Sequence, residues 1–184
     1  ITAVVVSAVA LATAAPMGAA MALEPPVGPA ILTVAGAITH HNRGAFDSTE
    51  DLLFAYHDYS FDHAARFDLA MLEALPSQDV SVSYAGWPRP AQLSGPWLRD
   101  VLAAAGATPK EGLTAVALDG FASEISPDDL AAQDWLVALK RDGRPLDLGG
   151  RGPVWLAYAR RDGKVADAED EGRWPWAVFL IEVK

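Results

Sequence analysis

The sequence predicts a single α+β domain with a mixed or antiparallel sheet and short helices. Two strand-like pairs flank the dipeptides Asp119-Gly120 and Asp142-Gly143, and Asp-Gly is a preferred sequence for a two-residue β-hairpin turn. Short helix patterns with capping residues alternate with these strands, and the sequence has no internal repeat. Strand pairs with interspersed short helices are typical of the α+β class.

The first 22 residues predict an export signal. They carry no charge, are rich in Ala and Val, and end in Ala20-Met21-Ala22, a small-residue pattern of the type that signal peptidase cleaves. A positively charged n-region is missing, so a buried helix or a retained membrane anchor stays as the alternative, although Pro16 disfavours a regular spanning helix. Removal of this segment leaves residues 23–184 as one mature domain without a membrane span, in the periplasm or secreted.

The N-terminal half of this domain predicts a strand, a helical insertion and a second helix. Residues 31–38 are almost continuously apolar, as in a buried strand, and Gly36 indicates a bulge or a close backbone approach. From about residue 40 to 66 the chain is polar and aromatic, and Asp, Ser and Glu within residues 47–50 predict a capped helix start. Asp68 is the expected N-cap of the next short helix.

The middle of the chain predicts a strand that ends in an aromatic turn, followed by a helix. Residues 81–85 alternate in polarity, and Gly86-Trp87-Pro88 then breaks the strand pattern. Ser94 or Gly95 is the expected cap of the next helix, with Pro96 at its first position and Gly106 at its end. One apolar stripe along this helix comprises Leu98, Val101, Leu102 and Ala105.

The C-terminal half predicts two hairpins and two closing strands. The hairpin strands are expected at 114–118 with 121–125 and at 135–140 with 145–148, and the closing strands at 154–159 and 177–183. Ser126 is the expected N-cap of a short helix between the hairpins. The acidic run within residues 167–171 predicts a solvated loop, and Trp174 and Trp176 predict core positions.

Charge and composition exclude several classes of partner. The formal net charge is −10 and the chain has no cysteine. An acidic chain without a basic patch disfavours nucleic acid and anionic membranes, both of which reward Lys and Arg. Disulfides and thiolate metal ligands are impossible within this chain. The four histidines all lie in the insertion, and either a zinc or copper site or a solvated histidine-rich surface explains them.

The order of these segments resembles the molybdopterin-binding domain of sulfite oxidase-type oxidoreductases, especially its small exported members. The resemblance covers most of residues 31–183 and is carried by an ordered series of segments, from which the insertion at 40–66 departs. It implies a sulfite oxidase-type fold. The segments are ILTVAGAI, FDLAMLEALP, LSGPWLRDVLAAAGA, AVALDGFASEISPDDL, LVALKRDGRPLDLGGRGPVWLAYA and the closing IEV.

Two departures from that family bear on chemistry. Catalytic members end the strand that resembles residues 81–87 in a cysteine whose thiolate binds molybdenum, and the nearest position here is Tyr84. A phenol with a pKa near 10 is a poor replacement for a soft thiolate ligand. Active members also carry an arginine for oxyanion binding after a Gly-x-Pro pattern, whereas this chain continues Gly152-Pro153-Val154-Trp155.

The sequence therefore predicts an exported non-catalytic binding or accessory module with a residual pocket. The resemblance places Tyr84, Gly86, Trp87, Arg89 and Trp155 at that pocket, as an aromatic and cationic lip for a planar or small organic ligand. Alternatively, the insertion packs against Trp87 and fills the vacated site. A small-molecule ligand and a periplasmic protein both remain candidate partners. The competing hypothesis is an oxidoreductase that holds molybdopterin without a thiolate.

Overall fold

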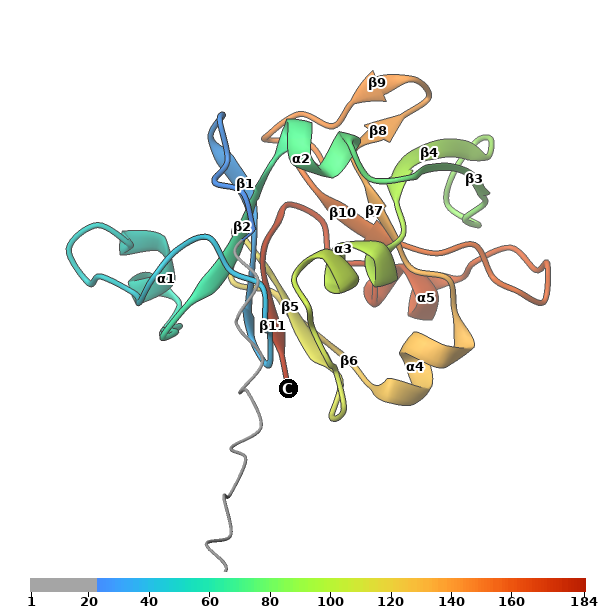
Figure 1. The fold of residues 1–184 in the computed structure, drawn as a ribbon. Helices are drawn as coiled ribbons and strands as arrows, with labels where there is room; N and C mark the ends of the chain where they lie inside the picture. Colours follow the sequence, from blue (N-terminus) through green and yellow to red (C-terminus); the bar gives the residue numbers. More distant parts are fainter. Residues whose placement is uncertain (1–22) are drawn as a thin grey trace, which may run out of the picture.

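The computed structural model describes residues 23–184, and the predicted export signal lies outside the described residues. A five-stranded mixed sheet with the order β2-β1-β11-β5-β6 forms the centre of the domain (Figure 1). Strands β1 and β11 are parallel, and the other neighbours are antiparallel. The α+β class is thus confirmed. The strands are β1 (Ala30–Gly36), β2 (Ala64–Asp68), β5 (Leu113–Ala117), β6 (Ala122–Ile125) and β11 (Val178–Val183).

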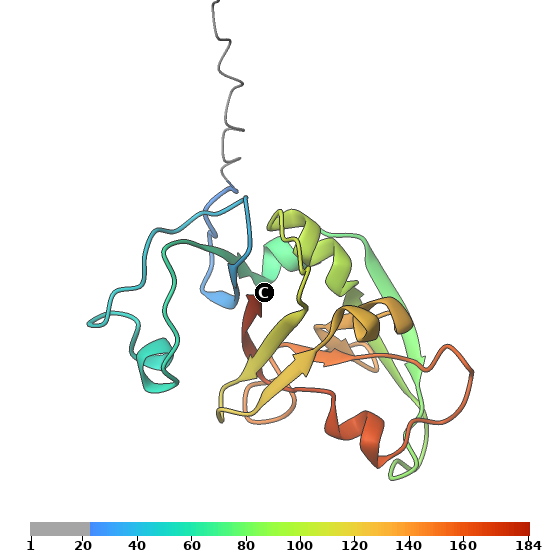
Figure 2. The same cartoon turned by 90° about the horizontal axis from the view of Figure 1, so that it is seen from below.

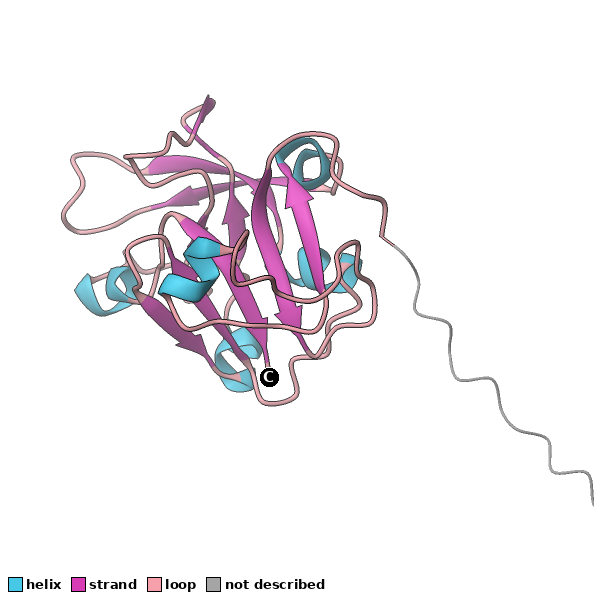
Figure 3. Ribbon diagram, turned by 90° about the vertical axis from the view of Figure 1, so that its left-hand side faces the viewer, coloured by secondary structure: helices cyan, strands magenta, loops and turns pink. Residues whose placement is uncertain are grey.

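Two smaller antiparallel units complete the strand framework (Figure 3). One is a four-stranded sheet with the order β3-β4-β8-β9, and the other pairs β7 with β10. The expected hairpin turn at Asp142-Gly143 joins β8 to β9. The strands are β3 (Ser77–Val82), β4 (Ala91–Pro96), β7 (Leu136–Ala138), β8 (Lys140–Arg141), β9 (Arg144–Pro145) and β10 (Trp155–Ala157).

Within residues 23–184, five short helices connect and cover these strands. Asp68 caps α2, as expected, because its carboxylate accepts from the Met71 amide at 2.8 Å. Ser126 begins α4 with a reciprocal capping box to Asp129, also as expected. No helix within residues 23–184 is long and apolar enough to cross a membrane. The helices are α1 (Leu52–Tyr56), α2 (Leu69–Glu73), α3 (Leu98–Ala104), α4 (Pro127–Ala132) and α5 (Ala168–Gly172).

The start of α3 differs from the expectation that Ser94 or Gly95 caps the helix. Residues 94–96 belong to β4, and the N-cap is Trp97, which makes no side-chain cap. Pairing of β4 with β3 and β8 overrides the local Ser-Gly-Pro signal. A Cβ on Gly95 would lie 2.0 Å from the Val137 carbonyl oxygen, so the glycine serves strand packing instead of helix capping.

The insertion at 40–66 is less helical than expected. Only α1 is helical within it, and residues 64–66 already belong to β2. The N-cap of α1 is Asp51, whose side chain does not cap because it pairs with both Nη atoms of Arg43, at 2.6 and 3.0 Å. A bidentate ion pair between Asp51 and Arg43 therefore replaces the expected cap at residues 47–50.

The main core lies between one face of the five-stranded sheet, helices α2 and α3, and the β7–β10 pair. A smaller cluster lies on the other face, where Phe54 and Phe61 of the insertion pack toward Phe179 of β11. At the C-terminal end of β1, Gly36 has a φ of +89°, and a Cβ there would lie 2.2 Å from the Val183 carbonyl oxygen. The close approach expected at Gly36 is therefore confirmed.

Candidate functional site

The aromatic turn after β3 is fixed by a segment that lies about 80 residues further along the chain. Tyr84 forms a parallel bridge with Ala166, and the Ala85 amide donates to the Ala166 carbonyl at 3.2 Å. The Trp87 amide donates to the Tyr84 carbonyl at 2.9 Å, which closes the turn. Backbone contacts to the segment before α5 thus hold this turn in place.

Trp87 lies at the centre of an aromatic cluster. Its ring centroid is 5.7 Å from Tyr84, 5.8 Å from Trp155 and 6.5 Å from Trp174. Trp87 itself is half-buried, whereas Trp155 and Trp174 are almost fully buried. Edge-on and tilted arrangements of this kind are the favourable geometries for aromatic pairs.

Two arginines lie against this cluster. The guanidinium carbon of Arg141 is 4.6 Å from the Trp87 ring centroid, and that of Arg151 is 5.8 Å from Trp87 and 4.6 Å from Trp155. These distances are within the range of cation–π attraction. Arg151 also donates to Glu171 Oε1 at 3.2 Å from both terminal nitrogens. Arg151 therefore links the tryptophan cluster to the acidic helix α5.

The structure brings together most of the residues that the sequence assigned to the pocket. Tyr84, Gly86 and Trp87 form the turn, and Trp155 supports Trp87 from the protein interior. Arg89 lies on the exposed side, where it pairs with Asp142 at 2.9 Å. The sequence raises Arg151, with Arg89, as a possible substitute for the missing arginine, but does not place it against the tryptophan rings. Arg141 was missed, because β8 approaches Trp87 only in the folded chain.

The insertion does not fill the region next to Trp87, contrary to the alternative raised from the sequence. Helix α1 and strand β3 lie at opposite ends of the molecule (Figures 1 and 2). The aromatic side chains of the insertion instead contact the sheet, with Phe54 at 5.4 Å from Phe179. Trp87 packs instead against Trp155 and Trp174.

A cavity of about 230 Å³ lies beside the tryptophan cluster. Trp174 reaches both the cavity and the cluster, and Trp176, 42% exposed, lies at the cavity wall. The sequence placed Trp176 in the core. The Trp-Pro-Trp triplet next to an acidic helix is the signal that could have identified this wall. The lining residues are Ala117, Asp119, Phe121, Glu171, Gly172, Trp174 and Trp176.

The acidic run at residues 167–171 is a helix and not the expected solvated loop. Asp167 caps α5 in a reciprocal capping box with Asp170. Asp170 is only 8% exposed, and it accepts from the Tyr158 hydroxyl at 2.7 Å and from Arg160 at 2.8 Å. Tyr158 and Arg160, which lie about ten residues earlier in the chain, therefore order this segment.

Two opposing effects act on the pKa of Asp170. Burial alone would raise it, but hydrogen bonds from Tyr158, Arg160 and the Asp167 amide outweigh burial and hold the pKa below its usual value. Burial, together with the hydrogen bond to Asp170, raises the pKa of Tyr158. The pair therefore consists of a carboxylate and a neutral phenol at neutral pH.

The four histidines do not form a metal centre. His41 and His63 have ring centroids 4.8 Å apart, but His40 contacts the Ala104 carbonyl and His57 contacts the Leu118 carbonyl. Within residues 23–184, no three His, Asp or Glu side chains gather in a way that would hold a metal ion. The structure thus supports no zinc or copper site at the described histidines.

The residues at the turn do not fit a thiolate-bound molybdenum cofactor. Tyr84 supplies a phenol that packs against Trp87, and a Cβ on Gly86 would lie 2.6 Å from the Tyr84 ring. Arg89 pairs with Asp142 and Arg151 with Glu171, whereas Arg141, over the Trp87 ring, lies 3.9 Å from Asp142. The residues of this turn supply no soft metal ligand.

Comparison with known proteins adds no family assignment. No family model matches the chain, and no curated protein matches its sequence. The resemblance to sulfite oxidase-type domains accordingly remains a prediction from the sequence.

Substitution of Trp87 by Ala tests whether this ring is a surface contact or a core residue. We expect Trp87→Ala to fold and to lose less free energy of unfolding than the roughly 3–5 kcal/mol of a fully buried tryptophan, because the side chain is half-buried. Urea unfolding of the variant and the parent chain measures the difference. A variant that fails to fold would show that Trp87 is core and not part of a ligand surface.

Proposed function

We propose that this chain is an exported, non-catalytic binding module on an oxidoreductase-like fold, located in the periplasm or secreted. The observation that carries the proposal is the aromatic cavity beside Trp174 and Trp176. None of its lining residues belongs to the turn where the resembling family holds its metal; the link is Trp174, whose ring centroid lies 6.5 Å from that of Trp87. The chain has no thiol and supplies Tyr84 at that turn. The chain has a cavity with an aromatic lining but lacks the metal ligand, and this combination favours ligand binding over catalysis.

The lining of the cavity indicates the class of ligand. Trp176 and Phe121 are both partly exposed and supply aromatic surface for stacking. Asp119 and Glu171 supply carboxylate oxygens, which accept hydrogen bonds and donate none. A small planar heteroaromatic molecule with amino groups matches these features.

A binding titration tests the proposal. We expect pterin or adenine to bind the purified chain, as measured by isothermal titration calorimetry, and benzoate to bind far more weakly because the Asp119 carboxylate at the cavity wall repels a second carboxylate. Trp176→Ala should weaken pterin binding at least ten-fold with little change in melting temperature, since Trp176 is 42% exposed. Failure of every amino-substituted heteroaromatic probe to bind would refute the proposal.

A further inference from the structure

A second cavity lies on the face of the five-stranded sheet that the insertion covers. It has a volume of about 320 Å³ and lies between the insertion, the outer face of the five-stranded sheet and the loop before β10. This volume is near the lower end of the range typical of ligand pockets, roughly 300–1,000 Å³. The lining residues are Ala30, Ile31, Thr33, Arg43, Leu53, Phe54, Arg66, Leu118, Leu148, Pro153 and Phe179.

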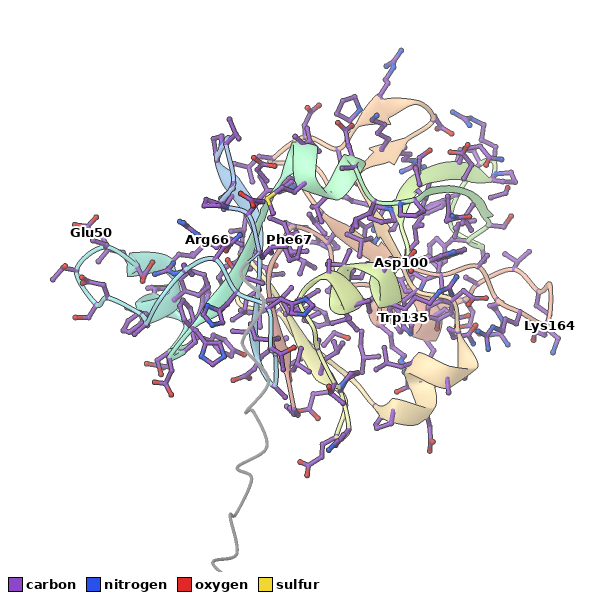
Figure 4. All side chains as sticks on the ribbon, viewed as in Figure 1. Glu50, Arg66, Phe67, Asp100, Trp135 and Lys164 are labelled. Carbon is purple, nitrogen blue, oxygen red and sulfur yellow. The ribbon has the colours of Figure 1, made fainter. Side chains whose placement is uncertain are left out.

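Most of this lining is apolar, and two of its polar residues lie side by side on the sheet. Thr33 of β1 and Arg66 of β2 are directly opposed cross-strand partners. Directly opposed residues of an antiparallel pair project from the same face. Figure 4 shows Arg66 at the side of the sheet that is near α1, away from Trp135 and Lys164. The cavity therefore has one cationic corner and apolar walls.

The two arginines of this cavity differ in their partners. Arg43 is neutralised by its ion pair with Asp51. Arg66 has no ion-pair partner among residues 23–184, and its Nε atom is buried without any hydrogen-bond acceptor. A buried polar group without a partner costs free energy, and the cost is larger for a charged group. Arg144 also has no ion-pair partner among residues 23–184, but it is exposed on β9, whereas Arg66 is half-buried.

We propose that this cavity binds a monocarboxylate with an apolar tail, such as a medium-chain acyl or aryl carboxylate. The carboxylate would accept from the Arg66 guanidinium, which matches its planar geometry. The tail would lie along the apolar walls formed by Leu53, Phe54 and Phe179. This site is separate from the tryptophan cavity, and its ligand chemistry is independent of the function proposed there.

Titration of the full chain with octanoate tests this site, with octanol as the uncharged control. We expect octanoate to bind at least ten-fold more tightly than octanol, because only octanoate satisfies Arg66. Affinity should also rise from butyrate to octanoate, by up to about four-fold for each added methylene. Equal affinities for octanoate and octanol would overturn the proposal.

Matched variants locate the carboxylate. Arg66→Gln should weaken octanoate binding at least ten-fold, whereas Arg144→Gln removes the same charge from the exposed strand β9 and should leave affinity unchanged. Equal losses in both variants would indicate a net-charge effect and overturn the proposal. If Arg66→Gln does not fold, Leu148→Glu decides, because Leu148 is 72% exposed and the new carboxylate at the cavity wall should weaken octanoate at least ten-fold. Unchanged octanoate binding in Leu148→Glu would refute the site.

Discussion

Trp155→Ala is expected to cause a large loss of stability. Trp155 is fully buried in β10 and contacts Trp87 and Trp174, and the Arg151 guanidinium lies over its ring. Deleting a buried tryptophan side chain removes its apolar burial and leaves a cavity, which together cost roughly 3–5 kcal/mol. Urea unfolding followed by circular dichroism should show this loss as a lower midpoint.

Two control variants separate the cost of the cavity from other effects. Trp155→Phe keeps an aromatic ring and removes an indole N–H that is buried without a hydrogen-bond partner among residues 23–184, so we expect a much smaller loss than for Ala. Trp176→Ala deletes the same side chain at a 42% exposed position and should also cost little. A Trp155→Ala variant as stable as Trp176→Ala would contradict the central place of Trp155 in the core.

Asp170→Ala is the second change for which we expect a large effect. It leaves the Tyr158 hydroxyl buried without an acceptor, a cost of about 1–3 kcal/mol, and Tyr158 is only 2% exposed. It also removes one of the two carboxylate partners of Arg160, the other being Asp162, and one half of the capping box of α5. The free energy of unfolding should fall accordingly.

A double variant shows whether the Tyr158 hydroxyl carries this cost. Tyr158→Phe combined with Asp170→Ala removes donor and acceptor together, so the double variant should lose less than the sum of the two single losses. Additive losses would mean that the hydrogen bond contributes nothing to stability.

The pH dependence of stability follows from the lowered pKa of Asp170. A carboxyl with a folded pKa below its unfolded value of about 3.9 stabilises the fold fully above that value. This contribution is lost as the pH falls through the folded pKa. The stability difference between the parent chain and Asp170→Ala should therefore be constant near neutral pH and shrink below about pH 4. A difference that grows on acidification would contradict the assigned ionisation.

Elements with strong local signals were predictable from the sequence. The cap at Asp68, the capping box at Ser126 and the Asp142-Gly143 turn each depend on residues within a few positions of one another. The predicted start of α3 was wrong, because pairing of β4 with two other strands outweighs the local Ser-Gly-Pro signal. The prediction that the acidic run is a loop was wrong for a similar reason, because contacts with Tyr158 and Arg160 order α5.

The candidate site was predictable only in part. Tyr84, Gly86 and Trp87 are neighbours in the chain, so a strand-to-turn pattern sufficed to group them. Arg141 and Arg151 reach the same ring from other segments, and no local pattern connects them to Trp87. The cavity depends on Trp174 and Trp176, whose aromatic character alone predicts burial and does not distinguish a cavity wall from a core.

Metal and pterin analysis of the chain, purified from cells able to make the molybdenum cofactor, tests the proposed function most directly. The chain has no cysteine, and the turn presents Tyr84 packed against Trp87. We therefore expect no stoichiometric molybdenum by plasma mass spectrometry, while a bound metal-free pterin would be detectable by its fluorescence. One molybdenum per chain would contradict the proposed binding module and establish the competing oxidoreductase.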